Sequence, residues 1–113
     1  MVSYLRRWWP LIERRQLSGR LDRGDALNGP KGWTLECKAE KRVDLPRYLR
    51  EAKAEAANNG DPWYAVIVKN RKGKFSSGTV GDAFVVMPLA QWAVYVDERE
   101  VMFDRLSALG ETT

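Results

Sequence analysis

The sequence predicts an α/β fold with a central mixed β-sheet flanked by helices. Three observations predict it. Residues 33–40 alternate apolar and polar side chains, which is typical of a strand. Residues 63–69 are a nearly continuous, β-branched apolar run, which favours a central strand buried on both faces. Residues 44–60 between them have helical spacing, so a helical crossover is expected to connect the two strands.

The elements are expected in the order helix, strand, strand, helix, strand, strand, helix. Residues 3–12 place apolar side chains at helical spacing, so a short first helix closed by Pro10 is expected there. Residues 13–23 are dense in arginine and include Ser18-Gly19, which indicates a flexible basic loop. Strands are expected at about 24–28 and 32–40. The Gly/Pro-rich turn at 28–32 would join them as an antiparallel hairpin.

The second half of the chain begins with a helix that has signals at both ends. Asp44 is an N-cap residue, Pro46 suits the first turn, and 58–60 (Asn-Asn-Gly) ends the helix. After the strand at 63–69, a Gly/Ser/Lys loop is expected at 70–81 and a further strand at 83–87. Pro88 opens a helical region to about Leu109, which we expect to be broken near Asp97.

Composition limits both the location and the chemistry. The 113 residues predict one domain, and no apolar run approaches the ~20 residues of a membrane span. A single cysteine fits a reducing compartment, so we expect a cytoplasmic protein. The absence of histidine excludes Ser-His-Asp and Cys-His catalysis, His-ligated zinc and HNH-type nuclease chemistry. Carboxylate, lysine and metal chemistry remain.

The formal net charge of +4 is unevenly distributed along the chain. Residues 1–56 hold 13 Lys and Arg against 8 Asp and Glu, whereas residues 57–113 hold 6 against 7. The basic half therefore favours a polyanionic partner.

The chemistry-bearing pattern lies in this basic half. In a strand, Glu36 and Lys38 share one face because they are two residues apart. The expected hairpin brings Asp25, eleven positions before Glu36, beside them. Two carboxylates and an ammonium can hold a divalent cation and a water beside a phosphate. The alternative is a polar strand face in water, with Lys38 paired to Glu36 or Glu40 at the surface.

Three segments resemble the PD-(D/E)XK nuclease superfamily, within it most closely the phage and archaeal Holliday junction resolvase-like endonucleases. They are residues 13–25, residues 33–38 and the helix at 44–57 with the strand after it. The resemblance covers roughly residues 11–95. It implies one domain over 1–113 with a restriction-endonuclease-like core. It also implies a Mg²⁺-dependent endonuclease, with Mn²⁺ as a possible substitute, that hydrolyses DNA phosphodiester bonds and resolves four-way (Holliday) junctions as a homodimer.

The resemblance assigns roles to individual residues. Asp25 and Glu36 would bind the metal together with the backbone carbonyl of Cys37, and Lys38 would act on the phosphate or the water. Ser18, before Gly19, lies where the resolvase branch carries a mobile Ser-Gly loop. The family has another acid in its first helix, whereas here no acid precedes Glu13. Either Glu13 takes that role from another place, or metal binding is weaker, or cleavage is lost.

Basic residues on both sides of the motif are expected to contact DNA phosphates, because guanidinium and ammonium groups pair with them. They are Arg14, Arg15, Arg20, Arg23, Lys69, Arg71, Lys72 and Lys74. The expected partner is branched DNA. Two other functions stay open: a non-catalytic nucleic-acid-binding domain on a decayed nuclease fold, and a flap or duplex nuclease of the same fold. The apolar excess near Trp8, Trp9, Trp92, Tyr95, Met102 and Phe103 predicts a two-fold dimer interface.

Overall fold

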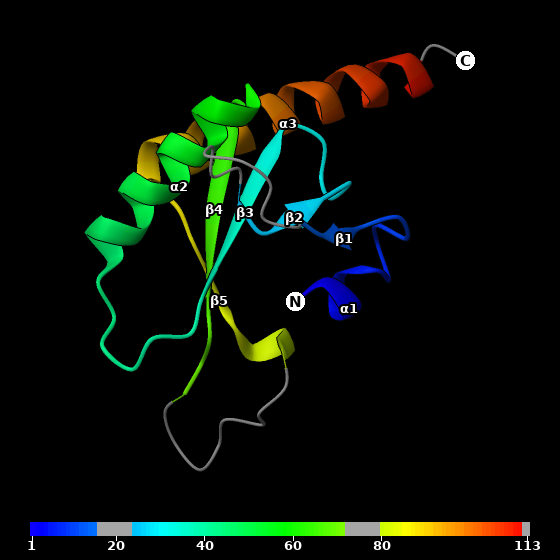
Figure 1. Ribbon diagram of the computed structural model, residues 1–113. Coiled ribbons are helices and arrows are strands. Elements are labelled where there is room, and N and C mark those ends of the chain that lie inside the picture. Colours follow the sequence, from blue (N-terminus) through cyan, green and yellow to red (C-terminus); the bar gives the residue numbers. More distant parts are fainter. Residues whose placement is uncertain (16–23, 72–79, 112–113) are drawn as a thin grey trace.

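The computed structural model describes residues 1–15, 24–71 and 80–111 (Figure 1). Its main sheet has the strand order β3 (Trp33–Lys38), β4 (Trp63–Val68) and β5 (Phe84–Val86). β3 runs parallel to β4, and β4 runs antiparallel to β5. This arrangement confirms the mixed α/β class, the mixed sheet and the central place of the strand at 63–69. A short 3₁₀ turn, η1 (Val80–Asp82), precedes β5.

Helix α2 (Leu45–Asn59) is the crossover between the two parallel strands and packs on both. Its predicted ends are confirmed. The Asp44 side chain accepts a hydrogen bond from the Arg47 N–H at 3.2 Å, and Gly60 closes the helix with φ +72°. Figure 1 shows α2 on one side of β3 and β4. The core lies at this contact, where Tyr48, Ala52, Val66 and Val68 are buried.

Three short elements occupy the opposite side of β3 and β4: α1 (Val2–Leu5), β1 (Glu13–Arg14) and β2 (Ala26–Leu27) (Figure 1). The first helix ends at Leu5, so the expected helix over 3–12 is wrong beyond its first turn. Hydrogen-bonded turns continue to Trp9, and Pro10, which disfavours helical backbone at the residue before it and carries no N–H, keeps the helix from continuing to residue 12. Residues 13–14 form a strand instead of loop. The remainder of that expected loop, 16–23, lies outside the described residues.

The expected hairpin has different pairing. β2 pairs antiparallel with β1, with Arg14 opposite Ala26 and Glu13 opposite Leu27, and no regular ladder joins β2 to β3. The connection after β2 has Asn28 at φ +59° and then Pro30, which cannot donate to a ladder. One expected contact survives, because the Asp25 N–H donates to the Leu35 carbonyl at 2.9 Å. Asp25 therefore lies against the edge of β3.

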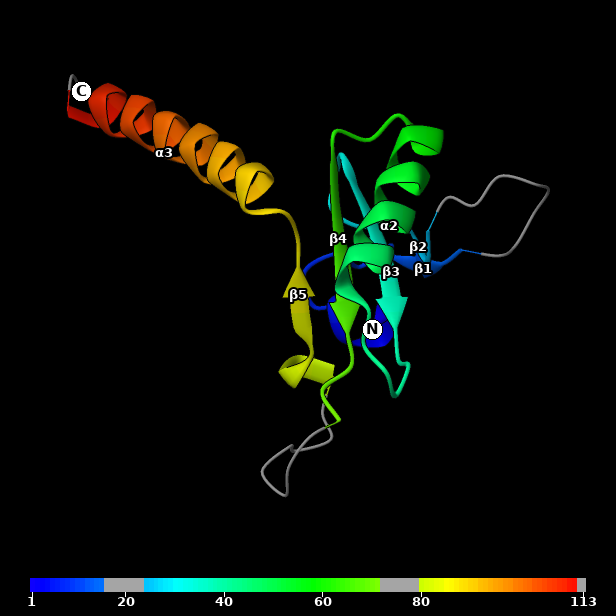
Figure 2. The same cartoon turned by 90° about the vertical axis from the view of Figure 1, so that its left-hand side faces the viewer.

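Helix α3 (Leu89–Glu111) is continuous, so the expected break near Asp97 is wrong. No proline or glycine interrupts residues 89–109, and the charged residues after Val96 are compatible with a helix. The Gln91 side-chain amide accepts a hydrogen bond from the Tyr64 N–H at 3.2 Å and donates one to the Tyr64 carbonyl at 2.8 Å. Beyond this attachment, the helix extends away from the rest of the molecule (Figure 2). Among the described residues, no helix is both long and apolar enough to cross a membrane.

Candidate active site

Asp25 is held against β3 by two hydrogen bonds. Its backbone N–H donates to the Leu35 carbonyl, and its Oδ2 accepts from the Cys37 N–H at 2.6 Å. The carboxylate is therefore fixed beside the segment Glu36-Cys37-Lys38, as the sequence predicted.

Gly24 makes this close approach possible. Its φ is +86°, and a Cβ built there would lie 2.9 Å from Thr34 Cγ2 and 3.0 Å from the Leu35 carbonyl oxygen. A side chain at this position would therefore push Asp25 away from β3. Sequence reasoning missed Gly24, although a glycine directly before a candidate acid is a usable signal.

Glu36 and Lys38 lie on the face of β3 that packs on α2. Lys38 Nζ is 3.7 Å from Glu36 Oε1 and 2.5 Å from Glu51 Oε2. The side chains of Glu36 and Lys38 keep only 11% and 15% of their exposure. Thr34 on the same face is also buried. The alternative of a polar face in water is therefore wrong.

The ion pair with Glu51 sets the charge state of Lys38. Burial pulls the pKa of Lys38 down, but the hydrogen bond that Lys38 donates to Glu51 and the charges of Glu36, Glu51 and Glu40 hold it above its ordinary value. The same hydrogen bond lowers the pKa of Glu51. Lys38 is consequently an ammonium at neutral pH and can act as a fixed positive charge, not as a general base.

Sequence reasoning missed Glu51. The only signal available was its position four residues after Arg47, and the two do pair at 3.2 Å. That spacing identifies a partner within the helix but says nothing of Lys38 on the neighbouring strand.

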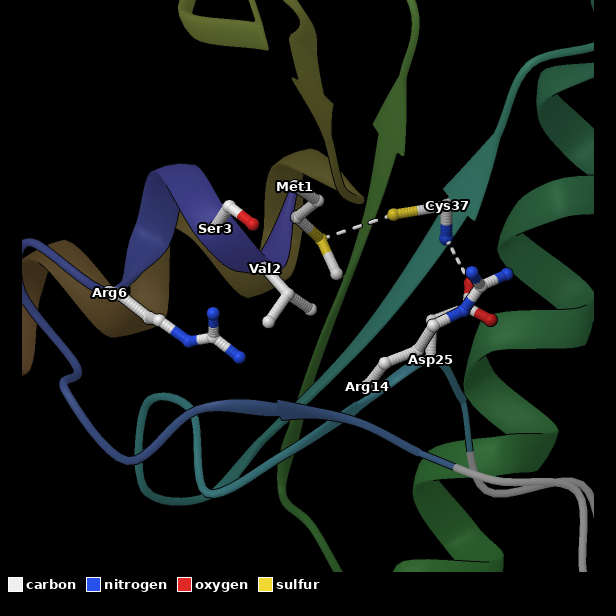
Figure 3. A pocket seen from close by; sticks show the side chains of 7 residues that line it. All are labelled: Met1, Val2, Ser3, Arg6, Arg14, Asp25 and Cys37. Carbon is white, nitrogen blue, oxygen red and sulfur yellow. Dashed lines mark hydrogen bonds between the residues drawn. The ribbon is translucent and has the colours of Figure 1, made fainter.

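A pocket of about 530 Å³ opens beside Asp25, on the side of β3 away from α2 (Figure 3). It is lined by Met1, Val2, Ser3, Arg6, Arg14, Asp25 and Cys37. Figure 3 shows Arg6 across the pocket from Arg14 and Asp25. Two guanidinium groups and a carboxylate thus border one cavity, a setting suited to a phosphate. Arg6 was not among the predicted DNA contacts.

Cys37 belongs to this pocket through its side chain. Its thiol lies 3.1 Å from Met1 Sδ (Figure 3). Burial, with a further contribution from the Asp25 charge, raises the pKa of Cys37 to about 11. The thiol is therefore neutral at pH 7 and is a poor metal ligand and nucleophile. Only the backbone carbonyl of Cys37, as the resemblance implies, would suit a hard cation.

The residue types suit magnesium, which takes one or two protein carboxylates and keeps several waters. Asp25 and Glu36 lie at neighbouring backbone positions, but Glu36 faces α2 with Lys38, whereas Asp25 borders the pocket on the other side of β3. The Cys37 N–H uses one lone pair of Asp25 Oδ2, and a carboxylate offers about four. Among the described residues, no group of three or more His, Cys, Asp or Glu could hold a metal ion. The magnesium site stays a prediction.

The remaining predicted residues take different places. Glu13 is exposed and lies opposite Leu27, whereas Arg15 donates its N–H to the Asp25 carbonyl. The register thus sets Glu13 two residues away from the position opposite Asp25. Its role stays a prediction. Ser18, Arg20, Arg23, Lys72 and Lys74 lie outside the described residues.

The described basic residues form two groups. Arg14 is exposed and Arg15 half-buried on β1 and just after it, next to the Asp25 pocket. Lys69 and Arg71 follow β4 and are exposed. The backbone N–H of Lys69 donates to the Lys38 carbonyl, and the Arg71 guanidinium donates to the Ala39 carbonyl. Positive charge therefore lies on both sides of the Asp25–Lys38 segment.

In comparisons with known proteins, no family model matches this chain, and neither does any curated protein or solved structure. A function for the chain therefore rests on its residues and their geometry.

Proposed function

We propose that this chain is a metal-dependent DNA endonuclease that hydrolyses phosphodiester bonds and resolves four-way junctions as a homodimer. One observation carries the proposal. The Asp25 carboxylate is fixed by the Cys37 N–H at 2.6 Å, directly between Glu36 and Lys38 in the sequence of β3. This is the juxtaposition that the resemblance to PD-(D/E)XK nucleases implies.

Each residue of the site has a distinct task. Asp25 and Glu36, with the Cys37 carbonyl, would hold Mg²⁺, which when bound polarises the phosphate and lowers the pKa of a bound water. The Lys38 ammonium neutralises charge that develops on the phosphate oxygens. Glu51 keeps Lys38 charged and in place. Arg14 and Arg6 orient a phosphate beside Asp25.

The homodimer follows from the reaction. Resolution of a four-way junction requires symmetric cuts in two strands, and one chain carries one Asp25–Lys38 segment. Two copies related by a two-fold axis supply the two sites. Arg14, Arg15, Lys69 and Arg71 would contact the DNA backbone around each site.

A second candidate is a nucleic-acid-binding domain that does not cleave. Two observations favour it: Lys38 is already engaged by Glu51 at 2.5 Å, and Glu13 lies opposite Leu27 and not opposite Asp25. In this case the basic surface would work without the carboxylates.

Incubation with labelled four-way junction, duplex and flap DNA separates the candidates. The proposal predicts cleavage in Mg²⁺ or Mn²⁺, none in EDTA, and the fastest cleavage on the junction. Cleavage of the flap or duplex alone would keep the nuclease and change its substrate. Binding without cleavage in either metal would leave the binding domain as the function.

A further inference from the structure

The outer part of α3, residues 97–111, makes a helical arm. Every residue from 97 to 110 is exposed, and four of the five large apolar side chains among them, all but Val101, are more than 60% exposed. Met102 is 62% exposed, Phe103 69%, Leu106 61% and Leu109 65%. An isolated helix of this length is marginal in water, and an apolar patch of this extent marks an interaction surface. The arm therefore needs a partner.

The apolar side chains of the arm continue a line that begins at the body of the protein. Tyr95, Met102 and Leu109 recur every seven residues, and Leu106 lies between the last two, so all four share one side of α3. The Tyr95 ring packs edge-on against Trp33 and Trp63, with centroids 5.2 and 5.7 Å away.

These rings also line an open hollow of about 730 Å³, here called the aromatic groove. Its wall includes Trp8, Leu11, Trp33, Trp63 and Tyr95, and Leu11 is 77% exposed. The groove thus adjoins the root of α3 on the side that carries the stripe. The groove and the apolar end of the arm therefore lie on the same side of α3, with the charged residues Glu98 and Arg99 between them.

Charge identifies the occupant. The arm carries five acidic and two basic residues, a net charge of −3, whereas residues 1–96 carry +7. Lys31 lies on the wall of the groove, whereas Arg6 lines the Asp25 pocket and Arg7 lies over the Tyr4 ring. The acidic apolar arm therefore complements the basic body of a second copy, with Lys31 at the groove itself. Two arms that met only each other would bring like charges together.

The exposed area is sufficient for a dimer. Trp92 is 50% exposed, and the four large apolar side chains of the arm exceed 60%. With large side chains burying roughly 150–250 Å² each when covered fully, these five offer on the order of 500 Å² per copy. The sum over both copies and their grooves exceeds the ~1,000 Å² that a specific interface needs.

We propose that α3 is the dimerisation element of this protein. A second copy lies antiparallel along α3, and the end of each arm, Phe103 to Leu109, covers the aromatic groove of its partner. The proposal rests on the homodimer of the proposed function and adds the surface that forms it.

Sedimentation of the full chain at tens of micromolar (about the level at which a standard interface is fully formed) tests the proposal. The unmodified chain should sediment as a dimer, and Phe103→Asp with Leu106→Asp should sediment as a folded monomer. Val94→Asp is the matched control: Val94 is 51% exposed but lies on the opposite side of the helix from Phe103, so this variant stays dimeric. Circular dichroism checks that each variant is folded.

A monomeric unmodified chain, or a dimeric double variant, would overturn the proposal. A monomer that binds lipid vesicles through the arm would overturn it in favour of a lipid surface. The antiparallel arrangement has its own test in the Cys37→Ala background. Leu89→Cys and Leu109→Cys chains should form a mixed disulfide on oxidation, whereas cross-linking of each only to itself would contradict that arrangement.

Cleavage assays keep this inference separate from the proposed function. Asp25→Asn should stay dimeric while losing cleavage. The monomeric α3 variant should lose paired cuts in a junction but keep Mg²⁺-dependent nicking. Loss of nicking in a folded α3 variant would contradict the assignment of α3 to dimerisation alone.

Discussion

Cys37 shows how one residue takes two roles through its backbone and its side chain. The backbone N–H fixes the Asp25 carboxylate, whereas the thiol is enclosed against Met1. The half-buried side chain lines the pocket on the face of β3 away from the α2 core. The contact with Met1 could not be predicted, because it joins residues 36 positions apart through a turn that no local pattern indicates.

We expect the Cys37 thiol to react slowly in the folded protein. Its pKa is raised from 9.0 to about 11, so the thiolate fraction near neutral pH is about 100-fold lower than in the unfolded chain. Alkylation by iodoacetamide, followed by mass spectrometry with and without urea, measures the difference. The native rate should also keep rising with pH to about 11. Equal rates in both states would contradict the buried thiol.

The Lys38–Glu51 pair predicts a pH dependence of stability. A lowered pKa in the folded state means that Glu51 stabilises the fold above the ordinary carboxyl value of 4.5 and that this stabilisation is lost as pH falls through the lowered value. Because the pKa of Lys38 is raised in the folded state, Lys38 stabilises the fold below pH 10.5. This stabilisation is lost as the pH rises through the raised pKa.

Glu51→Gln should therefore lower the free energy of unfolding at pH 7 by up to ~1 kcal/mol, because Glu51 is more than a third exposed. It should also flatten the loss of stability below pH 4.5. Urea unfolding between pH 3 and 8 measures both effects. Glu98→Gln on the exposed arm is the control and should leave the profile unchanged. If both variants show the same pH dependence of the free energy of unfolding, the Lys38–Glu51 ion pair does not stabilise the fold.

At the scale of elements, local signals predicted α2 and the strands β3 and β4. Asp44 and Gly60 act within a few residues of the chain, and alternation depends only on neighbours. The pairing of β2 with β1 and the contact of Lys38 with Glu51 depend on distant partners, and no spacing in the sequence reports them. The continuity of α3, in contrast, has a local signal, because residues 89–109 contain no proline or glycine.

The segment from Gly24 to Leu27 depends on a glycine. Gly24→Ala should lower the free energy of unfolding by about 2–4 kcal/mol, because it combines a positive φ with contacts of 2.9 and 3.0 Å. Gly60→Ala has a similar φ of +72° but nothing within 4 Å, so about 1 kcal/mol is expected. Urea unfolding of both variants separates the cost of the positive φ from the cost of the steric clash with β3. Equal losses would show that Asp25 does not need this close approach.

At the scale of the whole molecule, the distribution of charge predicts how DNA is bound. With Arg14, Arg15, Lys69 and Arg71 of both copies each releasing a counterion, the affinity of the homodimer should fall about 10⁴-fold between 50 and 200 mM salt. Fluorescence anisotropy in EDTA measures binding without cleavage. Lys69→Gln should reduce the salt dependence, whereas Lys53→Gln, an exposed lysine on α2, should not. Affinity that stays constant over this range would contradict an interface made of phosphate contacts.

Composition predicted the class of the whole molecule but not its shape. The missing histidines exclude histidine-dependent sites, and the basic first half favours a polyanionic partner. The apolar excess predicted a partner, and we propose the exposed side chains of α3 as its contact surface. A sequence read as one compact domain could not predict that a helix extends away from the body, because its apolar spacing equally suits a buried helix.

The most direct measurement of the central claim is junction cleavage by Asp25→Asn and Glu36→Gln. Each change removes one carboxylate but leaves the basic surface intact. We predict a cleavage rate in Mg²⁺ lowered by at least ~100-fold, since a bound metal contributes several kcal/mol to the transition state. Junction affinity in EDTA should be unchanged. Asp97→Asn, an exposed acid on α3, should cleave normally. Near-normal cleavage by both Asp25→Asn and Glu36→Gln would contradict the assignment of the site.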